Sequence, residues 1–513
     1  MSVSDFRTYG SQSDNPYLGG GRVILLFLLF FLSLYSFYKA GIAGFALAFG
    51  AVPIMVIAAA MAFKNQMFTF WLLFVVNYLV FFLTRMRWWV PGIPTSVPNE
   101  GLEMLLIALA VIDAGIMRFE KFANNMFLAL LIWGAYCTLE VLNNTCDLGL
   151  DFGVWYSGAR LMAFQLIYAF IVCSIYVDSP QRIMTFLRLW GIMSLFAAFW
   201  CWKQQTFGFN GPEKQFLIVA ARTHIVNGIT RYFSIFSDAA NFGINMAATA
   251  ALFYVVALTS KIKADKIFFL IVALACTKSF FASGTRTAIF CLLLGFMVYV
   301  VLSKSVKTGI ALVIAGILFV SFMMFTTIGN GNSQIRRMRS GFNPEDASAN
   351  VRKVNQAAMA KYLKEAPWGI GLGVDYSNVP VNNKFRKLST IPPDSEYVYI
   401  WVHTGAIGIT VFLATTALMW LSACWVVFFR LKNKSLHGIG AGLCSAFLAL
   451  QLGGYGNQVL MQFPNVFLFY GGLSLVFVLP RIEKEYEKYE EERFAAQEER
   501  KRLKAEKKAA ERV

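Results

Sequence analysis

Long apolar runs dominate this sequence and limit what it can fold into. Stretches close to the roughly 20 residues that an α-helix needs to cross a bilayer recur from Val23 almost to Pro480. The chain is 57% hydrophobic and only 15% charged, a composition that is uncommon in soluble proteins. We therefore expect an all-α, polytopic membrane protein.

About 12–14 transmembrane helices are expected, because several of the runs are short or interrupted. The segment 397–430 is long enough to include a re-entrant start. The candidate helices are residues 23–38, 41–63, 67–83, 102–117, 122–142, 160–177, 183–203, 241–260, 266–282, 285–303, 307–328, 397–430, 437–459 and 463–480.

Basic residues in the short connections predict the orientation, because they favour the cytoplasmic side of a membrane. Lysine and arginine recur in alternate connections, and the C-terminal tail falls on the same side. Arg85 and Arg87 lie on the opposite side and are the exception. We expect a cytoplasmic N-terminus over residues 1–22. Two long polar segments, 204–240 and 329–396, are expected to face the periplasm or cell exterior.

The domain organisation follows from these segments. We predict N-terminal transmembrane helices over 23–203, a second region over 204–480 that includes the outer loop 329–396, and a charged helical tail over 481–513. Glu and Lys recur three or four residues apart in the tail, as on a solvated helix. A cytoplasmic helical extension is one interpretation, and a coil that binds a partner protein is the other. No small-residue cleavage site precedes Val23, which predicts a retained first helix.

The charge, cysteine and histidine patterns argue against several functions. The net charge of +17 mostly follows the membrane orientation, and no basic soluble domain with a groove-reading motif is visible, so nucleic acid is not an expected partner. The eight cysteines are scattered without a CxxC pair, which indicates neither a metal site nor a disulfide framework. Three histidines without an HExxH, DxD or Gly-Lys-Ser/Thr motif argue against zinc chemistry and ATP hydrolysis. We expect no metal and no cofactor.

Arginine is frequent in the segments that we expect on the outer side, although the orientation rule places basic residues on the cytoplasmic side. The segment 329–396 holds ten Lys and Arg against six Asp and Glu. Arg286 stands between two apolar runs and faces outward; an unpaired guanidinium is costly inside a bilayer and belongs at an interface or in a polar cavity. Guanidinium groups bind phosphate through a planar fork. A surface-charge balance, or contact with anionic lipid headgroups, is the alternative.

Two carboxylates follow at the end of the same segment. Asp394 and Glu396 come after two prolines and just before an aromatic run that enters the bilayer. In one interpretation they complement the dipole of the helix that follows. In the other, they lie opposite the cationic loop and accept a proton. Earlier in the loop, residues 348–364 have the pattern of an amphipathic helix.

Several short motifs occur in a fixed order in this part of the chain. They are "RYFSIFSDAANFG" at 231–243 and "SGTRT" at 283–287, followed by R-x-R-S…S-x-x-x-R, P-x-G-x-G-x-G and D-S-x-Y-V-x-x-W-x-x-x-G-x-x-G. Together they resemble the O-antigen ligase and polysaccharide polymerase superfamily over roughly Arg231 to Phe412. The N-terminal helices match only in being numerous and apolar.

The resemblance implies a metal-independent, inverting glycosyltransferase of the GT-C type. Such an enzyme takes a glycan from undecaprenyl diphosphate at the outer face of the bacterial inner membrane. The acceptor is the lipid A core for a ligase, or a second carrier-linked glycan for a polymerase. Membrane lipids and other polysaccharide-assembly proteins are further expected partners. By position, Arg286 and Arg352 would bind the donor diphosphate. Weaker candidates for that role are Arg231 and one of Arg336, Arg337 and Arg339.

The chain departs from the ligase pattern at the expected catalytic base. Ligases place a histidine where this sequence has Asp394, and His403 falls nine positions later. A carboxylate can also accept a proton in a desolvated site, because burial raises its pKa. Asp394 is therefore the first candidate for the base, followed by Glu396 and His403. The substitution makes a polymerase at least as well supported as a ligase.

Two other classes of function stay open. A lipid-linked polysaccharide flippase or another transporter would also use cationic groups for a lipid diphosphate, along a central cavity. Transporters usually contain internal repeats, and none is clear in this sequence. A structural membrane scaffold is the other class, and the charged tail would then be its working part.

Overall fold

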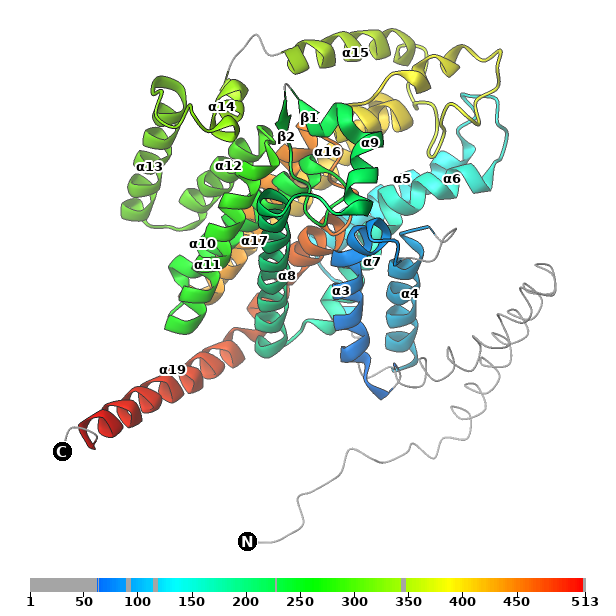
Figure 1. Ribbon diagram of the computed structural model, residues 1–513. Helices are drawn as coiled ribbons and strands as arrows, with labels where there is room; N and C mark the ends of the chain where they lie inside the picture. The colour runs from blue at the N-terminus through cyan, green and yellow to red at the C-terminus, as the bar shows by residue number, and fades with distance from the viewer. Residues whose placement is uncertain are drawn as a thin grey trace. The chain divides into compact units, whose positions relative to one another are not determined.

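The computed structural model describes residues 62, 64–88, 94–113, 119–226, 228–342 and 347–510 (Figure 1). It is 77% helical. In these ranges nine helices are long and apolar enough to cross a membrane, or ten if the bent pair Val466–Val476 and Leu479–Glu499 forms one span. The predicted all-α polytopic membrane fold is therefore confirmed. The candidate helices 23–38 and nearly all of 41–63 lie outside the described residues.

The described helices follow the predicted runs closely, with short 3₁₀ and π-helical turns between several of them. The elements are α3 (Gln66–Arg85), α4 (Val97–Ile112), α5 (Asn125–Leu139), α6 (Phe152–Ala159), α7 (Gln165–Tyr176), α8 (Pro180–Thr206), α9 (Gly211–His224), β1 (Ile225–Val226), β2 (Ile229–Thr230), α10 (Ala239–Thr259), α11 (Lys263–Ser283), α12 (Thr287–Leu302), α13 (Val306–Phe325), α14 (Ser333–Arg339), α15 (Ala347–Leu363), α16 (Glu396–Arg430), α17 (Lys434–Gly456), α18 (Gly471–Val476) and α19 (Leu479–Ala510).

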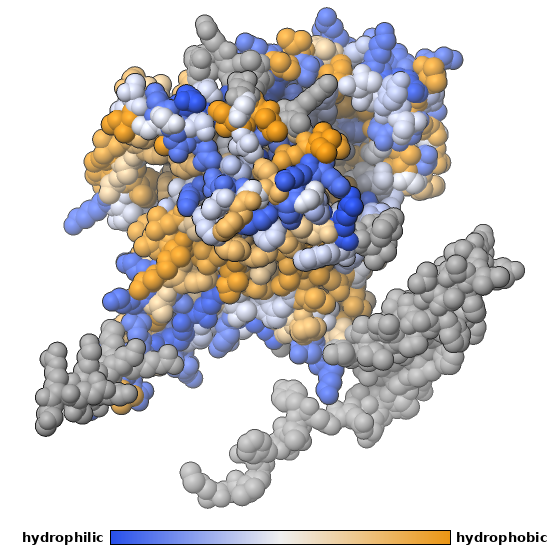
Figure 2. Space-filling view, viewed as in Figure 1, coloured by the Kyte–Doolittle hydropathy of each residue, from blue (hydrophilic) through white to orange (hydrophobic). Residues whose placement is uncertain are grey.

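The chain divides into two compact units, residues 1–69 and 70–513. This division does not test the boundaries predicted at residues 203 and 480, which stay predictions. On the face seen in Figure 2, hydrophobic residues of the second unit form a band with hydrophilic residues on both sides of it. Such a band is expected where helices contact the acyl chains of a bilayer.

Helix α10 is the centre of the second unit. It packs against α11, α12 and α17 and is buried almost all round. Small residues allow this close packing, as in other membrane helices. A Cβ at Gly442 of α17 would lie 2.8 Å from the Leu252 side chain of α10, and a Cβ at Gly438 would overlap the Thr259 side chain. Glycines spaced four apart therefore let α17 lie directly on α10.

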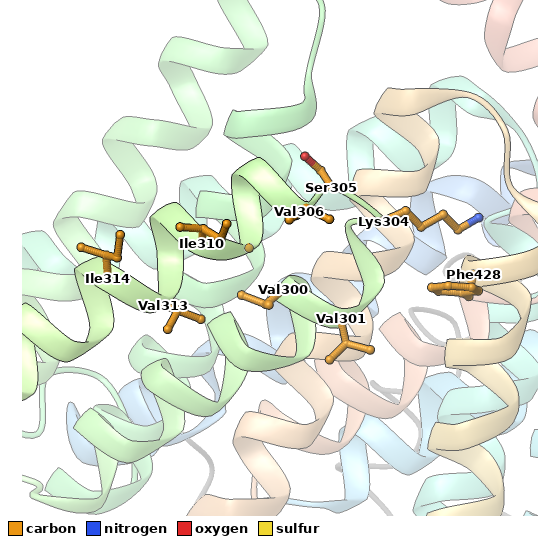
Figure 3. A pocket seen from close by; sticks show the side chains of 10 residues that line it. Val300, Val301, Lys304, Ser305, Val306, Ile310, Val313, Ile314 and Phe428 are labelled. Atoms are coloured by element: carbon orange, nitrogen blue, oxygen red, sulfur yellow. The ribbon is translucent and has the colours of Figure 1, made fainter.

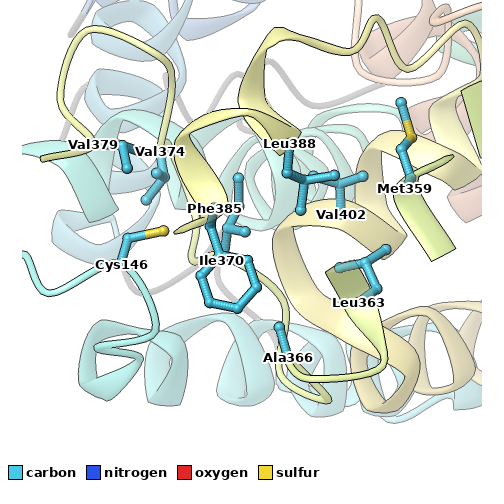
Figure 4. Packing of buried hydrophobic residues seen from close by; sticks show 10 residues of the cluster. All are labelled: Cys146, Met359, Leu363, Ala366, Ile370, Val374, Val379, Phe385, Leu388 and Val402. Carbon is cyan, nitrogen blue, oxygen red and sulfur yellow. The ribbon is translucent and has the colours of Figure 1, made fainter. Parts of the chain in front are cut away.

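The long segment 329–396 between α13 and α16 has a small hydrophobic core of its own. It contains α14 and α15, and α15 confirms the amphipathic helix predicted at 348–364. Figure 4 shows its buried side chains packed together with residues from outside the segment. The cluster consists of Cys146, Met359, Leu363, Ala366, Ile370, Val374, Val379, Phe385, Leu388 and Val402. The segment is thus a folded layer. We call the end of the helices that carries β1, β2, α14 and α15 the loop face (Figure 1).

The long helix α16 is interrupted near its start, and the re-entrant start expected for the 397–430 run stays a prediction. Gly405 has a φ of +66° and a non-helical ψ of −169°. The P-x-G-x-G-x-G motif pairs with the interruption: the N–H of Ile370 donates to the carbonyl of Val402 at 2.9 Å, and that of Gly371 to the carbonyl of His403 at 3.0 Å. The backbone of the glycine motif therefore packs against α16 at its kink and is hydrogen-bonded to it.

Replacing Gly405 by alanine is expected to destabilise the protein strongly. A left-handed φ costs a residue with a Cβ about 1–2 kcal/mol, and here the new Cβ would also overlap the carbonyl group of Pro367. Thermal unfolding of the purified variant in detergent measures the loss. Gly316→Ala is the matched control, because nothing lies within 4 Å of its Cβ position in α13. A Gly405→Ala variant as heat-stable as the control would show that the kink is not required.

The charged tail is helical, as predicted, and continues as α19 to Ala510. Its first half is bound to the ends of other helices. Arg493 pairs with Asp265 at the start of α11, and Lys261 donates to Glu490 at 2.8 Å. Glu483 accepts from the backbone N–H of Asn433 at 2.7 Å. That the tail lies on the cytoplasmic side of the membrane stays a prediction.

Candidate active site

A polar pocket of about 310 Å³ lies at the loop face, where segments far apart in the sequence meet. We call it the arginine pocket. Its described lining holds four arginines and no Asp or Glu. Arg231, Arg286 and Arg352, all predicted to share one site, are three of the four. The lining residues are Thr223, Val226, Arg231, Gly284, Thr285, Arg286, Thr287, Arg337, Arg352 and Asn457.

The Arg231 side chain is held between the end of α9 and the turn after α11. Its Nη1 donates to the carbonyl of Thr223 at 2.8 Å, and its Nη2 donates to Oγ1 of Thr285 at 3.1 Å. Its Nε donates to the carbonyl of Ser283 at 3.3 Å. These bonds fix the plane of the guanidinium, so Arg231 is a rigid wall of the pocket.

Arg85 supports the segment that follows Arg231. It donates from Nη1 to the carbonyl of Ser234 at 3.0 Å, and from Nη2 to the carbonyls of Phe236 and Ser237. Its guanidinium also lies over two phenylalanine rings, at 4.6 and 4.4 Å from their centroids. These contacts give Arg85 a structural role that does not depend on the predicted membrane orientation.

The motif at 283–287 forms the turn between α11 and α12 and supplies four lining residues. Gly284 ends α11 with a left-handed φ of +61°. A Cβ at this position would lie 3.0 Å from the Arg337 side chain and 3.3 Å from that of Arg231. Glycine is therefore needed both for the turn and for the approach of two arginines.

The other arginines come from three separate elements. Arg286 stands directly before α12, and its Nη1 donates to Oγ of Ser340 at 3.2 Å. Arg337 of α14 donates from Nε to the carbonyl of Gly284 at 2.9 Å. Arg352 of α15 donates from Nη2 to the carbonyl of Gly456 at 2.7 Å. These three contacts are with neutral oxygens, and they help to orient the guanidinium groups.

The charges in the pocket repel one another. The pKa of Arg231 falls from 12.5 to about 10, first because its guanidinium is buried, and then because Arg337, Arg286 and Arg352 add positive charge; Asp238 opposes the shift. Arg231 still carries its proton at neutral pH. An anion with several negative charges would relieve this repulsion, so the pocket is electrostatically suited to a diphosphate.

Two of the predicted arginines lie elsewhere. Arg339 donates to Oγ1 of Thr326 at 3.1 Å and to the carbonyl of Ile328 at 2.7 Å. Arg336 donates to the carbonyl of Asn330 at 2.9 Å. Both guanidinium groups thus bind the turn between α13 and α14, and neither residue lines the arginine pocket. Among the three arginines of α14, the pocket residue is Arg337.

Asp394 lies near the pocket and is exposed. Its Oδ2 accepts from Nδ2 of Asn355 at 3.3 Å. Asn355 follows Arg352 by three residues in α15, so the two side chains share one face of that helix. The next residue, Ser395, donates to the carbonyl of Gly454 at 3.1 Å, close in the chain to the lining residue Asn457. The carboxylate therefore contacts a residue of α15 that lies about one helical turn from Arg352, an arginine of the pocket.

Glu396 and His403 are buried and do not line the pocket. Oε2 of Glu396 accepts from the N–H of Leu460 at 2.9 Å and so holds the connection after α17. Nδ1 of His403 donates to the carbonyl of Gly371 at 2.9 Å, within the glycine motif. The contacts of both side chains support the backbone around the site.

The described residues include no group of three or more His, Cys, Asp and Glu side chains arranged to hold a metal ion. Asn, Thr and Arg supply the polar lining of the arginine pocket. These side chains offer hydrogen-bond donors, which suit an anionic ligand.

The fold and the pocket define a polytopic α-helical membrane protein with a cationic site at its loop face. Residues 268–413 match the family model described as O-antigen ligase. This match confirms the resemblance to the O-antigen ligase superfamily, and it supports a function in polysaccharide assembly in a membrane. The matched region includes Arg286, Arg337, Arg352 and Asp394, whereas Arg231 lies before it. A search of curated proteins finds no match.

Proposed function

We propose that this protein is a membrane glycosyltransferase that moves a glycan from undecaprenyl diphosphate to an acceptor glycan, without a metal and with inversion at the anomeric carbon. The convergence of four arginines from separate segments in one pocket supports this proposal most directly. The match to the O-antigen ligase family supports the same reaction class. The site would face the periplasm.

The reaction breaks the bond between the anomeric carbon and the diphosphate oxygen. Negative charge then develops on the departing diphosphate, and fixed guanidinium groups stabilise it best where water is scarce. Arg286 and Arg352 would bind the phosphate oxygens from opposite elements, with Arg231 and Arg337 beside them. Each guanidinium has a planar pair of N–H groups that matches two phosphate oxygens. The carrier leaves as undecaprenyl diphosphate.

The acceptor hydroxyl attacks the anomeric carbon and loses its proton to a general base. Asp394 is the best-placed candidate, because it is exposed and lies beside the α15 face that carries Arg352. Glu396 and His403 are better suited to positioning, since their polar atoms bind backbone groups. The sequence has an aspartate where ligases have a histidine, so a carrier-linked glycan is at least as well supported as the lipid A core as the acceptor.

A transfer assay with the purified protein tests the proposal. The protein, reconstituted in liposomes without an ion gradient, is given a labelled glycan on undecaprenyl diphosphate together with an acceptor glycan. We expect a longer or acceptor-linked labelled product and free undecaprenyl diphosphate. Movement of the label across the bilayer without any new glycosidic bond would contradict the proposal and identify a transporter.

A further inference from the structure

An apolar groove lies at the other end of α12 from the arginine pocket. Helix α12 begins at Thr287, which lines the pocket, and its 16 residues extend to Leu302. This length corresponds to about 24 Å, most of the thickness of a bilayer core. The groove beyond it has a volume of about 550 Å³. It therefore lies toward the opposite membrane surface and is separate from the proposed active site.

The walls of the groove come from three helices. α12 provides Val300 and Val301, the first half of α13 provides most of the remaining apolar side chains, and α16 provides Phe428. Figure 3 shows Ile314 at one end of the groove and Lys304 with Phe428 at the other. The full lining is Val300, Val301, Lys304, Ser305, Val306, Gly309, Ile310, Val313, Ile314 and Phe428.

Positive charge gathers at one end only. Nζ of Lys304 lies 4.7 Å from the centroid of the Phe428 ring. Ser305 then caps α13 by accepting from the N–H of Thr308 at 3.3 Å, and Lys307 follows in the first turn. The start of a helix carries partial positive charge. One end of the groove therefore attracts an anion, while the rest is apolar over about 12 Å of α13, from Val306 to Ile314.

Helix α13 makes few contacts with the rest of the protein. Only 11% of its apolar window is buried, and Gly309 and Met323 are its buried residues. A Cβ at Gly309 would lie 3.3 Å from the Val300 side chain, so α13 and α12 touch at this position. An elongated apolar molecule would fill the space between α13, α12 and α16.

We propose that this groove binds an anionic phospholipid. One acyl chain lies along α13 toward Ile314, and the phosphate lies between Lys304, Lys307 and the first turn of α13. The positive end favours an anionic lipid over a zwitterionic one, because lysines near a membrane surface attract negative headgroups. The bound lipid stabilises the packing of α13, whose C-terminal end leads to α14.

Lipid binding to the purified full-length protein tests this proposal. The protein is placed in nanodiscs of phosphatidylcholine with or without phosphatidylglycerol, and its melting temperature and bound lipids are measured by thermal unfolding and native mass spectrometry. We expect phosphatidylglycerol to raise the melting temperature and to be retained. Lys304→Gln should weaken retention about fivefold. Val313→Trp should abolish it, because the indole occupies the groove.

Two matched variants serve as controls. Lys266→Gln removes an exposed lysine from α11, and Leu274→Trp adds an indole to an exposed position of the same helix. Both should retain the lipid as the wild type does. Equal stabilisation by phosphatidylcholine alone would overturn the proposal. Wild-type retention of phosphatidylglycerol by Lys304→Gln and Val313→Trp would also overturn it. Two further results would contradict it: conversion of a dimer to a monomer by Val313→Trp, which would assign the groove to a second copy of the chain, and displacement of the bound lipid by undecaprenyl phosphate.

Discussion

Arg286→Ala and Arg352→Ala are each expected to lower the rate of glycan transfer by about 10²–10³, the effect of deleting one donor from an oxyanion-binding site. Arg286 precedes α12, and Arg352 comes from α15, yet both line one pocket. Each variant would lose a charged group that binds the leaving diphosphate. The measurements are polysaccharide length and attachment in a strain without the native copy, and the transfer rate of the purified protein.

The controls for these variants come from the same region. Arg339→Ala removes an arginine that binds the turn between α13 and α14, so transfer should fall less than about tenfold, as for a contact outside the site. Arg337→Ala, two residues earlier, should behave like Arg286→Ala. Arg352→Lys should retain only part of the wild-type activity, because lysine keeps the charge but lacks the planar fork of donors. Wild-type polysaccharide in both Arg286→Ala and Arg352→Ala cells would contradict the proposed site.

Most of the fold was predictable from the apolar runs. The predicted 183–203 and 437–459 correspond to α8 and α17, because an apolar run of bilayer length has few alternatives to a membrane helix. The structure adds detail that composition does not specify. The run 397–430 contains a kink at Gly405, and the glycine motif, which is distant in the sequence, packs against this kink. Such a contact depends on tertiary structure and has no local signal.

The convergence of Arg231, Arg286 and Arg352 was predictable from the motif order and the orientation rule. The identity of the fourth arginine was not. Three arginines fall within four residues of α14, and successive side chains on a helix point about 100° apart. A helix of seven residues with one buried side chain, Met338, gives too little periodicity to predict which arginine faces the site. That choice depends on how α14 packs against the 283–287 turn.

Asp394 and Glu396 differ in their exposure to solvent, and this difference could not be predicted from the sequence. Asp394 and Glu396 are two positions apart, yet the first is exposed and the second is buried against the connection after α17. Asn457, which lines the pocket, follows the end of α17 and belongs to none of the motifs that indicated the site. Neighbouring polar residues at the start of a helix point in different directions, and only the structure shows which side chain is exposed.

Asp394→Asn is expected to lower the transfer rate by about 10²–10⁴ if this carboxylate is the general base. The amide has nearly the same shape, and its oxygen can still accept from Asn355, so the local structure should persist. It cannot accept the proton of the acceptor hydroxyl. Donor binding should change little, because the diphosphate contacts lie in the arginine pocket. Single-turnover transfer and separate donor-binding measurements distinguish the two effects. Asp375→Asn is the matched control, since the exposed carboxylate of Asp375 accepts from the N–H of Ser377 at 2.7 Å in the same segment, 329–396. Transfer that survives in Asp394→Asn but is lost in Glu396→Gln would assign the base to the buried carboxyl instead.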